Sequence, residues 1–497
     1  MFFYRIFAVM KNQTLNIAYK VTSAFMESIP KSKRKTYGQF FTSRKTAEFM
    51  ASMFTLHLDK PQIKILDAGA GTGLLATALV ERLRTEGYKG EVFVTCYEND
   101  KVVLPILEES MNNLMRLESV KYEIKKDNYL LSQRFAENDL YLPDPDTYDM
   151  IIGNPPYLKI PKDAPEAISM PEVCHGAPNL YFLFLSMGIR NLKDNEELVY
   201  IIPRSWTSGA YFERFRTFLF RYCVIMDIHI FGSRDKVFDG ETVLQETMII
   251  KLRKTRNHPE TIHMSSSETS DFSDIKHYDV PYDTVVAPNR YVFLVTNPEE
   301  AETLSRVNRQ NNTLNSDNLR MRTGLIVDFR SRDALRDEEE NGTYPLFFSQ
   351  HIKDGRVSWP IGKEGEYILT NRLAYLQENT DYIFVKRFTA KEDKRRLQCG
   401  IYLTAEHKPY KYISTQNKIN YIKCDSPEIA FGLFAILNST LYDNYYRILN
   451  GSTQVNSTEI NIMPIPSRST IQQMGIELIG QELTEQNCNK IIDKWIK

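Results

Sequence analysis

The sequence has few cysteines, and they show neither of the arrangements that bind metal or build a disulfide framework. Its six cysteines are scattered over 497 residues, and no two of them form a C-x-x-C pair. Zinc sites and disulfide-rich domains bring cysteines together at short, regular spacings. We therefore expect no bound metal and no disulfide framework.

Long apolar runs and an excess of one charge are also missing. No apolar stretch reaches the roughly 20 residues of a membrane span, and the apolar opening MFFYRIFAVM is short and lacks a small-residue cleavage signal. We expect a cytoplasmic protein with no membrane partner, whose first residues form a helix that packs on the body. The formal net charge is −1, so a nucleic acid could bind only to a locally basic face.

The first half of the chain alternates strand-like with helix-like stretches. Apolar runs such as Ile63–Gly69 and Tyr148–Tyr157 alternate with helical stretches such as Leu74–Gly87 and Leu180–Leu192. This alternation predicts an α/β fold with a doubly wound, mostly parallel, Rossmann-like sheet. Such sheets bind ligands at the carboxyl ends of their strands.

The alternation fades beyond the Ser-rich stretch Met264–Asp274, which predicts a domain boundary there. We expect an N-terminal helical extension over 1–34, a ligand-binding catalytic domain over 35–262 and a mixed α+β domain over 263–497. In the last of these, Phe431–Leu449 has the pattern of one long helix.

The first chemical motif is D-A-G-A-G-T-G, which occupies Asp67–Gly73 between a predicted strand and a predicted helix. Glycine allows the backbone to turn sharply and to approach a ligand closely, and here it alternates at Gly69, Gly71 and Gly73. An acid followed by alternating glycines at this place is typical of enzymes that bind S-adenosylmethionine. Asp67 would meet the methionine ammonium of that cofactor.

Two further acids end the next two predicted strands. Glu98 stands where dinucleotide-binding folds place a carboxylate that accepts hydrogen bonds from ribose hydroxyls. Asp127 ends the strand after that and could accept from the adenine amino group of the cofactor. Either acid alone would be an ordinary surface residue, but their register after successive strands favours a cofactor site.

The motif that decides the chemistry is N-P-P-Y, Asn154-Pro155-Pro156-Tyr157, at the end of an apolar strand. An exocyclic amine on a base is a poor nucleophile because its lone pair is delocalised into the ring. The Asn154 amide oxygen and the Pro155 carbonyl can each accept a hydrogen bond from one N–H of this amine, which favours a tetrahedral nitrogen. The two prolines stiffen the loop and keep both acceptors in place. Tyr157 offers a ring on which an extruded base can stack.

Together with G-Q-F-F-T at Gly38–Thr42, these motifs resemble the amino-methyltransferases of restriction–modification systems. Their order along the chain resembles the gamma class of adenine-N6 DNA methyltransferases, which includes the TaqI-type enzymes, and is most similar to the BsuBI/PstI type. The resemblance implies transfer of a methyl group from S-adenosylmethionine to adenine N6 in duplex DNA, with CTGCAG as recognition sequence. It also implies a separate partner restriction endonuclease that forms no stable complex with the chain.

The resemblance carries over several site residues. Asp67, Glu98 and Asp127 would hold the cofactor, and Asn154 and Tyr157 the target adenine. Phe238 matches a phenylalanine that packs on the flipped base. The remaining cofactor-pocket residues would be Gln39, Phe40, Phe41 and Thr42.

The C-terminal half would then be the DNA target-recognition domain. Gln454 and Asn456 have side chains suited to adenine edges. Its basic run suggests phosphate contacts from Lys386, Arg387, Lys394, Arg395 and Arg396. A large asymmetric recognition domain suggests a monomer that methylates each strand separately.

Other functions stay open at this point. N-P-P-Y also occurs in methyltransferases that act on RNA bases, on a protein glutamine amide or, usually with serine in place of Asn154, on cytosine N4. A bifunctional methylase–nuclease and a non-catalytic DNA-binding module are further alternatives. No G-x-x-x-x-G-K-[ST] loop is present, which argues against ATP-driven translocation.

Overall fold

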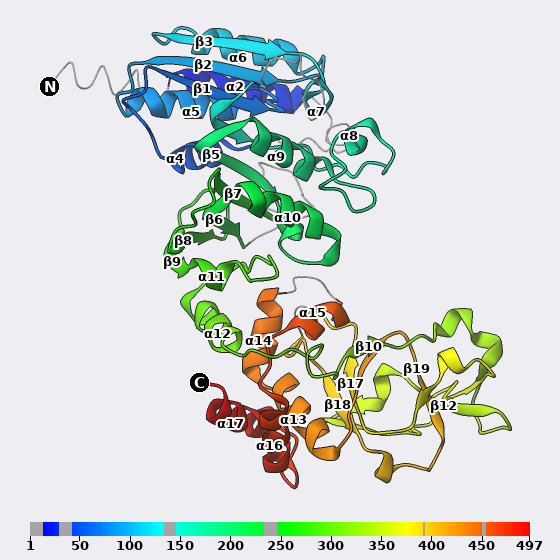
Figure 1. Cartoon of the computed structure of the whole chain (residues 1–497). Helices are drawn as coiled ribbons and strands as arrows, with labels where there is room; N and C mark the ends of the chain where they lie inside the picture. Colours follow the sequence, from blue (N-terminus) through cyan, green and yellow to red (C-terminus); the bar gives the residue numbers. More distant parts are fainter. Residues whose placement is uncertain (1–12, 29–41, 134–145, 233–245, 391–392, 450–453) are drawn as a thin grey trace, which may run out of the picture. The chain divides into compact units, whose positions relative to one another are not determined.

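The computed structural model describes residues 13–28, 42–133, 146–232, 246–390, 393–449 and 454–497 (Figure 1). The chain divides into two compact units, Met1–Thr296 (unit 1) and Asn297–Lys497 (unit 2).

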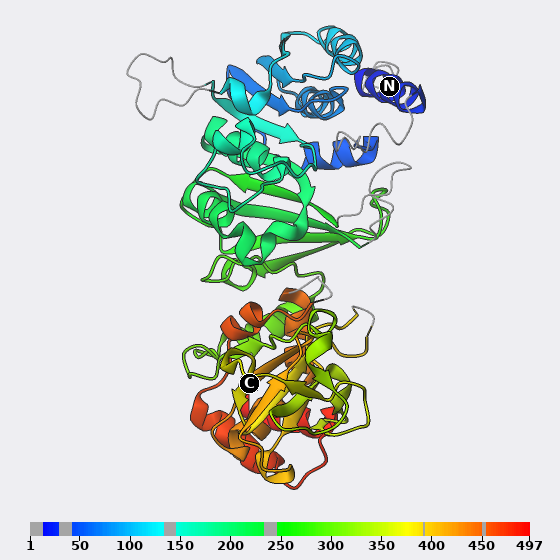
Figure 2. The ribbon, with the colours of Figure 1, turned by 90° about the vertical axis from the view of Figure 1, so that its right-hand side faces the viewer.

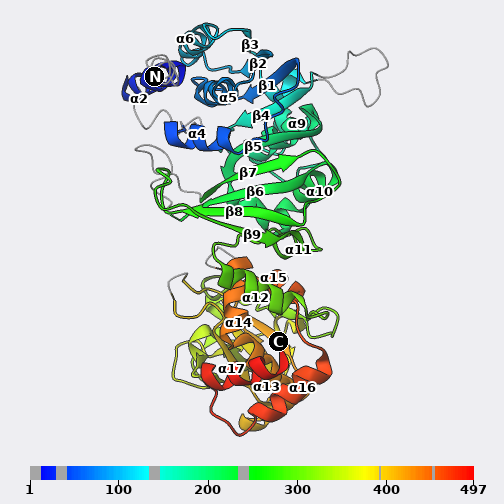
Figure 3. The ribbon, with the colours of Figure 1, turned by 90° about the vertical axis from the view of Figure 1, so that its left-hand side faces the viewer.

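Unit 1 is built around a nine-stranded sheet with the strand order β3-β2-β1-β4-β5-β7-β6-β8-β9 (Figure 3). The strands from β3 to β5 in this order are parallel, and β7 runs antiparallel to both of its neighbours. All six residues of β4 are buried, as expected for a parallel strand covered on both faces. The strands are β1 (Gln62–Ala68), β2 (Glu91–Tyr97), β3 (Val120–Lys125), β4 (Tyr148–Gly153), β5 (Leu192–Pro203), β6 (Val224–Phe231), β7 (Thr247–Arg253), β8 (Thr261–Ser267) and β9 (Lys276–Pro281).

Helices cover both faces of this sheet, which confirms the predicted doubly wound α/β fold. Figure 3 shows α2, α4, α5 and α6 on one side and α9 and α10 on the other. Their bounds are α2 (Gln13–Ser28), α4 (Arg44–Ser52), α5 (Leu74–Thr85), α6 (Leu104–Leu114), α9 (Leu180–Asn191) and α10 (Glu213–Tyr222), and the short helices are α7 (Tyr129–Ser132), α8 (Pro165–Ile168) and α11 (Tyr282–Val285). The α2 helix is anchored on α5, because the Thr14 hydroxyl and the Leu15 amide both donate to the Glu81 carboxylate.

Unit 1 continues further along the chain than the predicted boundary after residue 262, which falls inside β8. The Ser-rich stretch resembled a linker, but Ser265 and Ser267 are buried in β8. Their hydroxyls lie 2.9 and 3.1 Å from the two ring nitrogens of the fully buried His229 on β6. The serines are therefore partners of a buried imidazole, and the division between the units comes after Thr296.

Unit 2 is mixed α+β, as predicted. Its two sheets have the orders β10-β20-β17-β18-β14-β13 and β11-β15-β12-β19-β16. Figures 1 and 2 show the C-terminal helices, in orange to red, beside these strands. The strands are β10 (Met321–Thr323), β11 (Leu335–Arg336), β12 (Thr343–Phe347), β13 (Ile352–Lys353), β14 (Arg356–Val357), β15 (Tyr367–Leu369), β16 (Gln377–Glu378), β17 (Tyr382–Lys386), β18 (Cys399–Tyr402), β19 (Tyr412–Thr415) and β20 (Ile419–Lys423), and the helices are α12 (Pro298–Asn308), α13 (Pro427–Leu437), α14 (Thr440–Leu449), α15 (Ser457–Ile462), α16 (Arg468–Leu478) and α17 (Glu485–Trp495).

The long helix predicted over Phe431–Leu449 is two helices, α13 and α14. The break falls at Ser439, whose hydroxyl donates to the Ile436 carbonyl and accepts from the Tyr442 amide. A serine that satisfies backbone groups in this way competes with a continuous helix and begins a new one.

Candidate active site

The glycine loop after β1 has the backbone that its sequence predicts. Gly69, Gly71 and Gly73 have φ angles of 73°, 55° and 79°, in the left-handed region that residues with a Cβ rarely adopt. The amides of Gly69 and Ala70 both donate to the Tyr97 carbonyl at 2.9 Å. The loop is thus tied to the end of β2. Gly69 and Gly71 line a cavity, whereas Gly73 begins α5 and packs on α6.

Asp67 lies behind this loop and is not among the residues that line the cavity, which departs from the predicted direct contact with the methionine ammonium. The side chain is fully buried, and its Oδ2 accepts from the Ala76 amide of α5 at 3.2 Å. Its Oδ1 is buried without a hydrogen-bond partner in the described part of the chain. Burial raises the pKa of Asp67 to about 7. The carboxyl group therefore holds the loop to α5.

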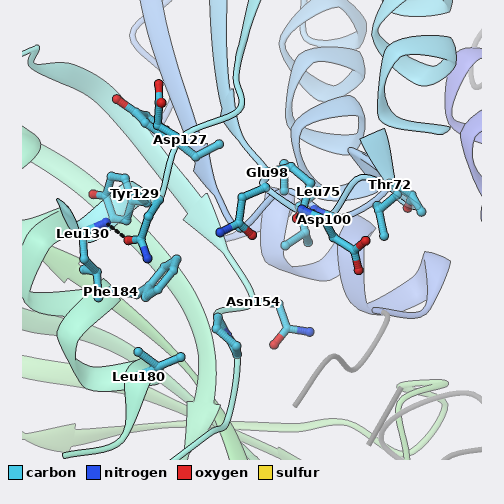
Figure 4. A pocket seen from close by; sticks show the side chains of 18 of the residues that line it. Thr72, Leu75, Glu98, Asp100, Asp127, Tyr129, Leu130, Asn154, Leu180 and Phe184 are labelled. Atoms are coloured by element: carbon cyan, nitrogen blue, oxygen red, sulfur yellow. Dashed lines mark hydrogen bonds between the residues drawn. The ribbon is translucent and has the colours of Figure 1, made fainter. Parts of the chain in front are cut away.

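The cavity has a volume of about 630 Å³ and lies at the carboxyl ends of β1 to β4. Its wall combines polar residues that follow these strands with apolar side chains such as Leu180 and Phe184 of α9 (Figure 4). Pockets of this size, largely apolar with a few polar groups, are typical sites for cofactors.

Both predicted strand-end acids line this cavity. Glu98, after β2, is 8% exposed, and burial raises its pKa. Its Oε2 accepts from the Gly71 amide at 3.0 Å and its Oε1 from the Asp100 amide at 2.9 Å, so the side chain is held against the glycine loop. Asp127, after the neighbouring strand β3, is exposed and also lines the cavity (Figure 4).

Asn154 follows β4 and points into the same cavity (Figure 4). Its Nδ2 donates to Oγ1 of Thr42 at 3.1 Å, and Thr42 also lines the cavity. This bond fixes the plane of the Asn154 amide. Of the G-Q-F-F-T residues only Thr42 is described; Gln39, Phe40 and Phe41, like Phe238, lie outside the described residues.

The rest of the N-P-P-Y motif is packed firmly. Pro156 lines the cavity, and Pro155 is buried. Tyr157 is 9% exposed, its hydroxyl donates to the Ile201 carbonyl at 3.0 Å, and its ring meets that of Tyr181 edge to face at 6.4 Å. The position of the Tyr157 ring is therefore fixed at both of its ends.

Comparison with known proteins identifies the family. The family model described as Eco57I restriction-modification methylase matches residues 18–238. The type II methyltransferase M.PstI of Providencia stuartii is 31% identical over 97% of this chain and 98% of its own. M.BsuBI of Bacillus subtilis is 35% identical over 92% of this chain and 94% of its own. This chain is a restriction–modification methylase of the M.PstI and M.BsuBI type.

A solved structure resembles the methylase in part. The methyltransferase subunit of a type I restriction-modification system from Streptococcus thermophilus matches 55% of this chain and 54% of its own, with 17% identity and a TM-score of 0.37.

The methylase uses S-adenosylmethionine, and its cavity fits that cofactor. Because Gly69 and Gly71 have no side chains, the part of the loop that faces the cavity leaves room for a ligand. The carboxylates of Glu98 and Asp127 line the cavity and suit a ligand that carries two positive charges and a ribose, and Leu180 and Phe184 add apolar surface of the kind that an adenine ring would need.

Sequence reasoning missed several lining residues. Thr22, on α2, reaches the cavity and donates from Oγ1 to Oγ1 of Thr72 at 2.7 Å. Asp100 and Glu166 also line the wall. Asp100 could have been predicted to line the cavity, because it stands two residues after Glu98 at the same strand end. No local sequence pattern indicates that Thr22 or Glu166 lines the cavity.

The basic residues that were predicted to contact DNA differ in how exposed their side chains are. The Lys394 side chain is 89% exposed, and Lys386 and Arg387 are half-buried. Arg396 is 1% exposed, with its Nε donating to Thr389, and Arg395 donates to the Leu437 and Ser439 carbonyls. The prediction of phosphate contacts is therefore wrong for Arg396, and Arg395 is occupied in holding the start of α14.

The two amide residues predicted to read adenine lie next to a tyrosine. Gln454 and Asn456 are half-buried, and the hydroxyl of Tyr446 donates to the Gln454 carbonyl and accepts from the Asn456 amide.

No helix among the described residues is long and apolar enough to span a membrane.

Proposed function

We propose that this methylase transfers a methyl group to N6 of adenine in duplex DNA, after the target base has been turned out of the helix. The observation that carries the proposal is the position of Asn154. It follows β4, beside β1 in the sheet, so that a base held by Asn154 enters the cavity that the glycine loop of β1 lines.

The residues of the N-P-P-Y motif would prepare the amine. When bound, S-adenosylmethionine supplies an electrophilic methyl group on its sulfonium sulfur. The Asn154 amide oxygen and the Pro155 carbonyl accept one amine hydrogen each, which favours a tetrahedral nitrogen whose lone pair is no longer delocalised. Thr42 keeps the Asn154 amide in one plane through the 3.1 Å bond. The amine nitrogen would then bond to the methyl carbon while the bond between that carbon and sulfur breaks, so that a neutral thioether leaves and the proton lost by the nitrogen passes to water.

Tyr157 would stack against the turned-out base. Its hydroxyl bond to Ile201 and its edge contact with Tyr181 hold the ring in place, so little conformational entropy is lost when a base packs on it. The chain would act as a monomer, and a separate endonuclease would cut unmodified sites without forming a stable complex with it.

The acceptor is identified by incubating the protein with S-adenosylmethionine carrying a labelled methyl group and, separately, duplex DNA, RNA or protein. We expect label in duplex DNA only, and N6-methyladenine after digestion to nucleosides. Label in RNA or protein, or N4-methylcytosine in the digest, would refute the proposal. Sequencing of the modified DNA then identifies the recognition sequence.

Base extrusion and the role of Asn154 need separate tests. A fluorescent adenine analogue at the target position should brighten when the protein binds, because the base leaves the stack. Asn154→Ala should slow transfer by about 100-fold or more with unchanged cofactor affinity. The exposed Asn257→Ala provides the matched control, which should transfer at the normal rate. Normal transfer by Asn154→Ala would contradict the mechanism.

A further inference from the structure

One end of the six-stranded sheet of unit 2 brings together distant parts of the chain. β17 ends at Lys386, which pairs with Ile419 at the start of β20, and β10 ends at Thr323, which pairs with Asn420. The segments that leave these strand ends are therefore neighbours. Figure 1 shows β10 and β17 in the same part of unit 2 as α15.

Backbone hydrogen bonds join these segments into one surface. The Asn417 amide donates to the Ile326 carbonyl at 2.8 Å, and the Arg387 amide donates to the Lys418 carbonyl at 2.9 Å. The Val455 amide donates in turn to the Arg387 carbonyl at 2.7 Å. Segments that are far apart in sequence are thus held side by side by main-chain contacts, which makes the surface rigid.

Apolar side chains protrude from this rigid surface. Phe329 is 63% exposed, Leu325 59% and Phe388 46%. Each phenylalanine carries an arginine on its ring, with Arg330 at 5.4 Å from the centroid of Phe329 and Arg387 at 5.5 Å from that of Phe388. We name these residues, with one neighbouring lysine, the β17-end surface: Leu325, Phe329, Arg330, Arg387, Phe388 and Lys418.

The β17-end surface has more cations than acids among its own residues, in a chain whose net charge is −1, and the hollow beside Phe329 is lined by Asp337 and Glu364 as well as by Arg332 and Lys363. Arg330, Arg387 and Lys418 contribute three positive charges. The carboxylate of Asp328 lies 3.7 Å from the Lys418 ammonium and offsets one of them. A surface on which exposed apolar side chains lie between cations fits a ligand with negative charges at its edges and apolar groups between them.

We infer that the β17-end surface contacts duplex DNA at the methylation site. Phe388 and Leu325 face base edges, where the thymine methyl group is an apolar partner, and Arg330 and Lys418 meet phosphates. The inference rests on the proposed function, because it assumes that duplex DNA is the substrate. It assigns sequence recognition to Phe388 and Leu325, which no motif of the sequence marked.

The test compares the full-length protein with single variants in binding to two duplexes, one with the sequence that the wild type methylates and one without it. Lys418→Ala and Arg330→Ala remove exposed cations. We expect them to weaken binding to both duplexes and to lower the slope of log affinity against log salt by about one each. Phe388→Ala should weaken binding to the methylated sequence at least about fivefold, with little effect on the other duplex.

Matched controls come from elsewhere on unit 2. Lys353→Ala removes an exposed lysine on β13, the far edge strand of the same sheet, and Leu373→Ala removes an apolar side chain that is 70% exposed. Both should bind DNA as the wild type does. Thermal unfolding of every variant checks that unit 2 is folded, and Lys418→Ala keeps the test valid should Phe388→Ala unfold.

The outcomes separate the two proposals. If the wild type methylates no duplex DNA, the proposed function fails. If it methylates DNA and the surface variants bind DNA as the controls do, the function stands and the inference is overturned, with a protein partner left as the occupant of this surface.

Discussion

Replacing Asp67 by asparagine should change how the stability of unit 1 depends on pH. Burial raises the pKa of Asp67 from its ordinary 3.8 to about 7. The folded protein therefore keeps a proton that the unfolded chain releases once the pH exceeds about 4. The free energy of unfolding should fall as the pH rises from about 4 to about 7, and this contribution is absent in Asp67→Asn.

The size of the effect follows from the size of the shift. A pKa difference of about three units, at 1.36 kcal/mol per unit, corresponds to about 4 kcal/mol. An asparagine oxygen can still accept from the Ala76 amide, so the contact with α5 need not be lost. The stability of Asp67→Asn relative to the wild type should thus rise by about 4 kcal/mol between pH 4 and pH 8.

Urea unfolding without cofactor, at several pH values in this range, measures the difference. The chain has three tryptophans, and Trp206 is fully buried in unit 1. Trp359→Phe and Trp495→Phe, made in both proteins, leave Trp206 as the fluorescent reporter of unit 1. Other groups that titrate on unfolding, such as His229, contribute equally to both proteins and cancel. Parallel pH profiles for the two proteins would refute the reasoning, because Asp67 would then be ionised in the folded state.

Three further predictions concern the same unit. Asp149→Asn should lower the free energy of unfolding by roughly 3 kcal/mol at pH 7, because a backbone hydrogen bond and ion pairs with two lysines outweigh burial and lower the pKa of Asp149. The loss should stay constant from pH 7 to about pH 4 and shrink only below pH 4, and a loss that shrinks between pH 7 and pH 5 would contradict this. Thr42→Val should slow single-turnover methyl transfer about tenfold through loss of the bond to Asn154, and Thr42→Ser should restore the rate. Gly73→Ala should destabilise by roughly 2 kcal/mol, because its φ is left-handed and because the ends of the Met111 and Leu107 side chains, 2.7 and 2.8 Å from the new Cβ, must both shift. Gly87→Ala, with a similar φ but nothing within 4 Å, should cost about 1 kcal/mol, and equal losses on thermal unfolding would show that packing is irrelevant.

Much of unit 1 could be predicted because its strands are continuous apolar runs and its helices have clear ends. The predicted strand Ile63–Gly69 agrees with β1 within one residue at each end, and the helix predicted over Leu74–Gly87 ends two residues early. The glycine loop and Asn154 also lie at the predicted edge of the sheet, because the order of residues along a parallel strand determines which of them reach its carboxyl end.

Side-chain direction and burial could not be read in the same way. Asp67 has the sequence context of a ligand to the cofactor, yet its carboxyl group turns towards the amide of Ala76 in α5. Arg396 stands in a basic run, but Asp443, 47 residues later, accepts from its backbone amide and helps to hold it in the interior. Both outcomes depend on contacts with residues that no local pattern connects to the motif.

The pairing of β1 with β4 has a consequence for the reaction itself. In this parallel pair Asp67 is opposite Ile152, two residues before Asn154. Adjacent strands are about 4.8 Å apart, a spacing that backbone hydrogen bonds set. The separation between the glycine loop and the Asn154 amide, which in the proposed mechanism hold the methyl donor and its acceptor, is therefore a property of the sheet. Mutations in surface loops could alter which DNA is bound and leave the distance over which the methyl group moves unchanged.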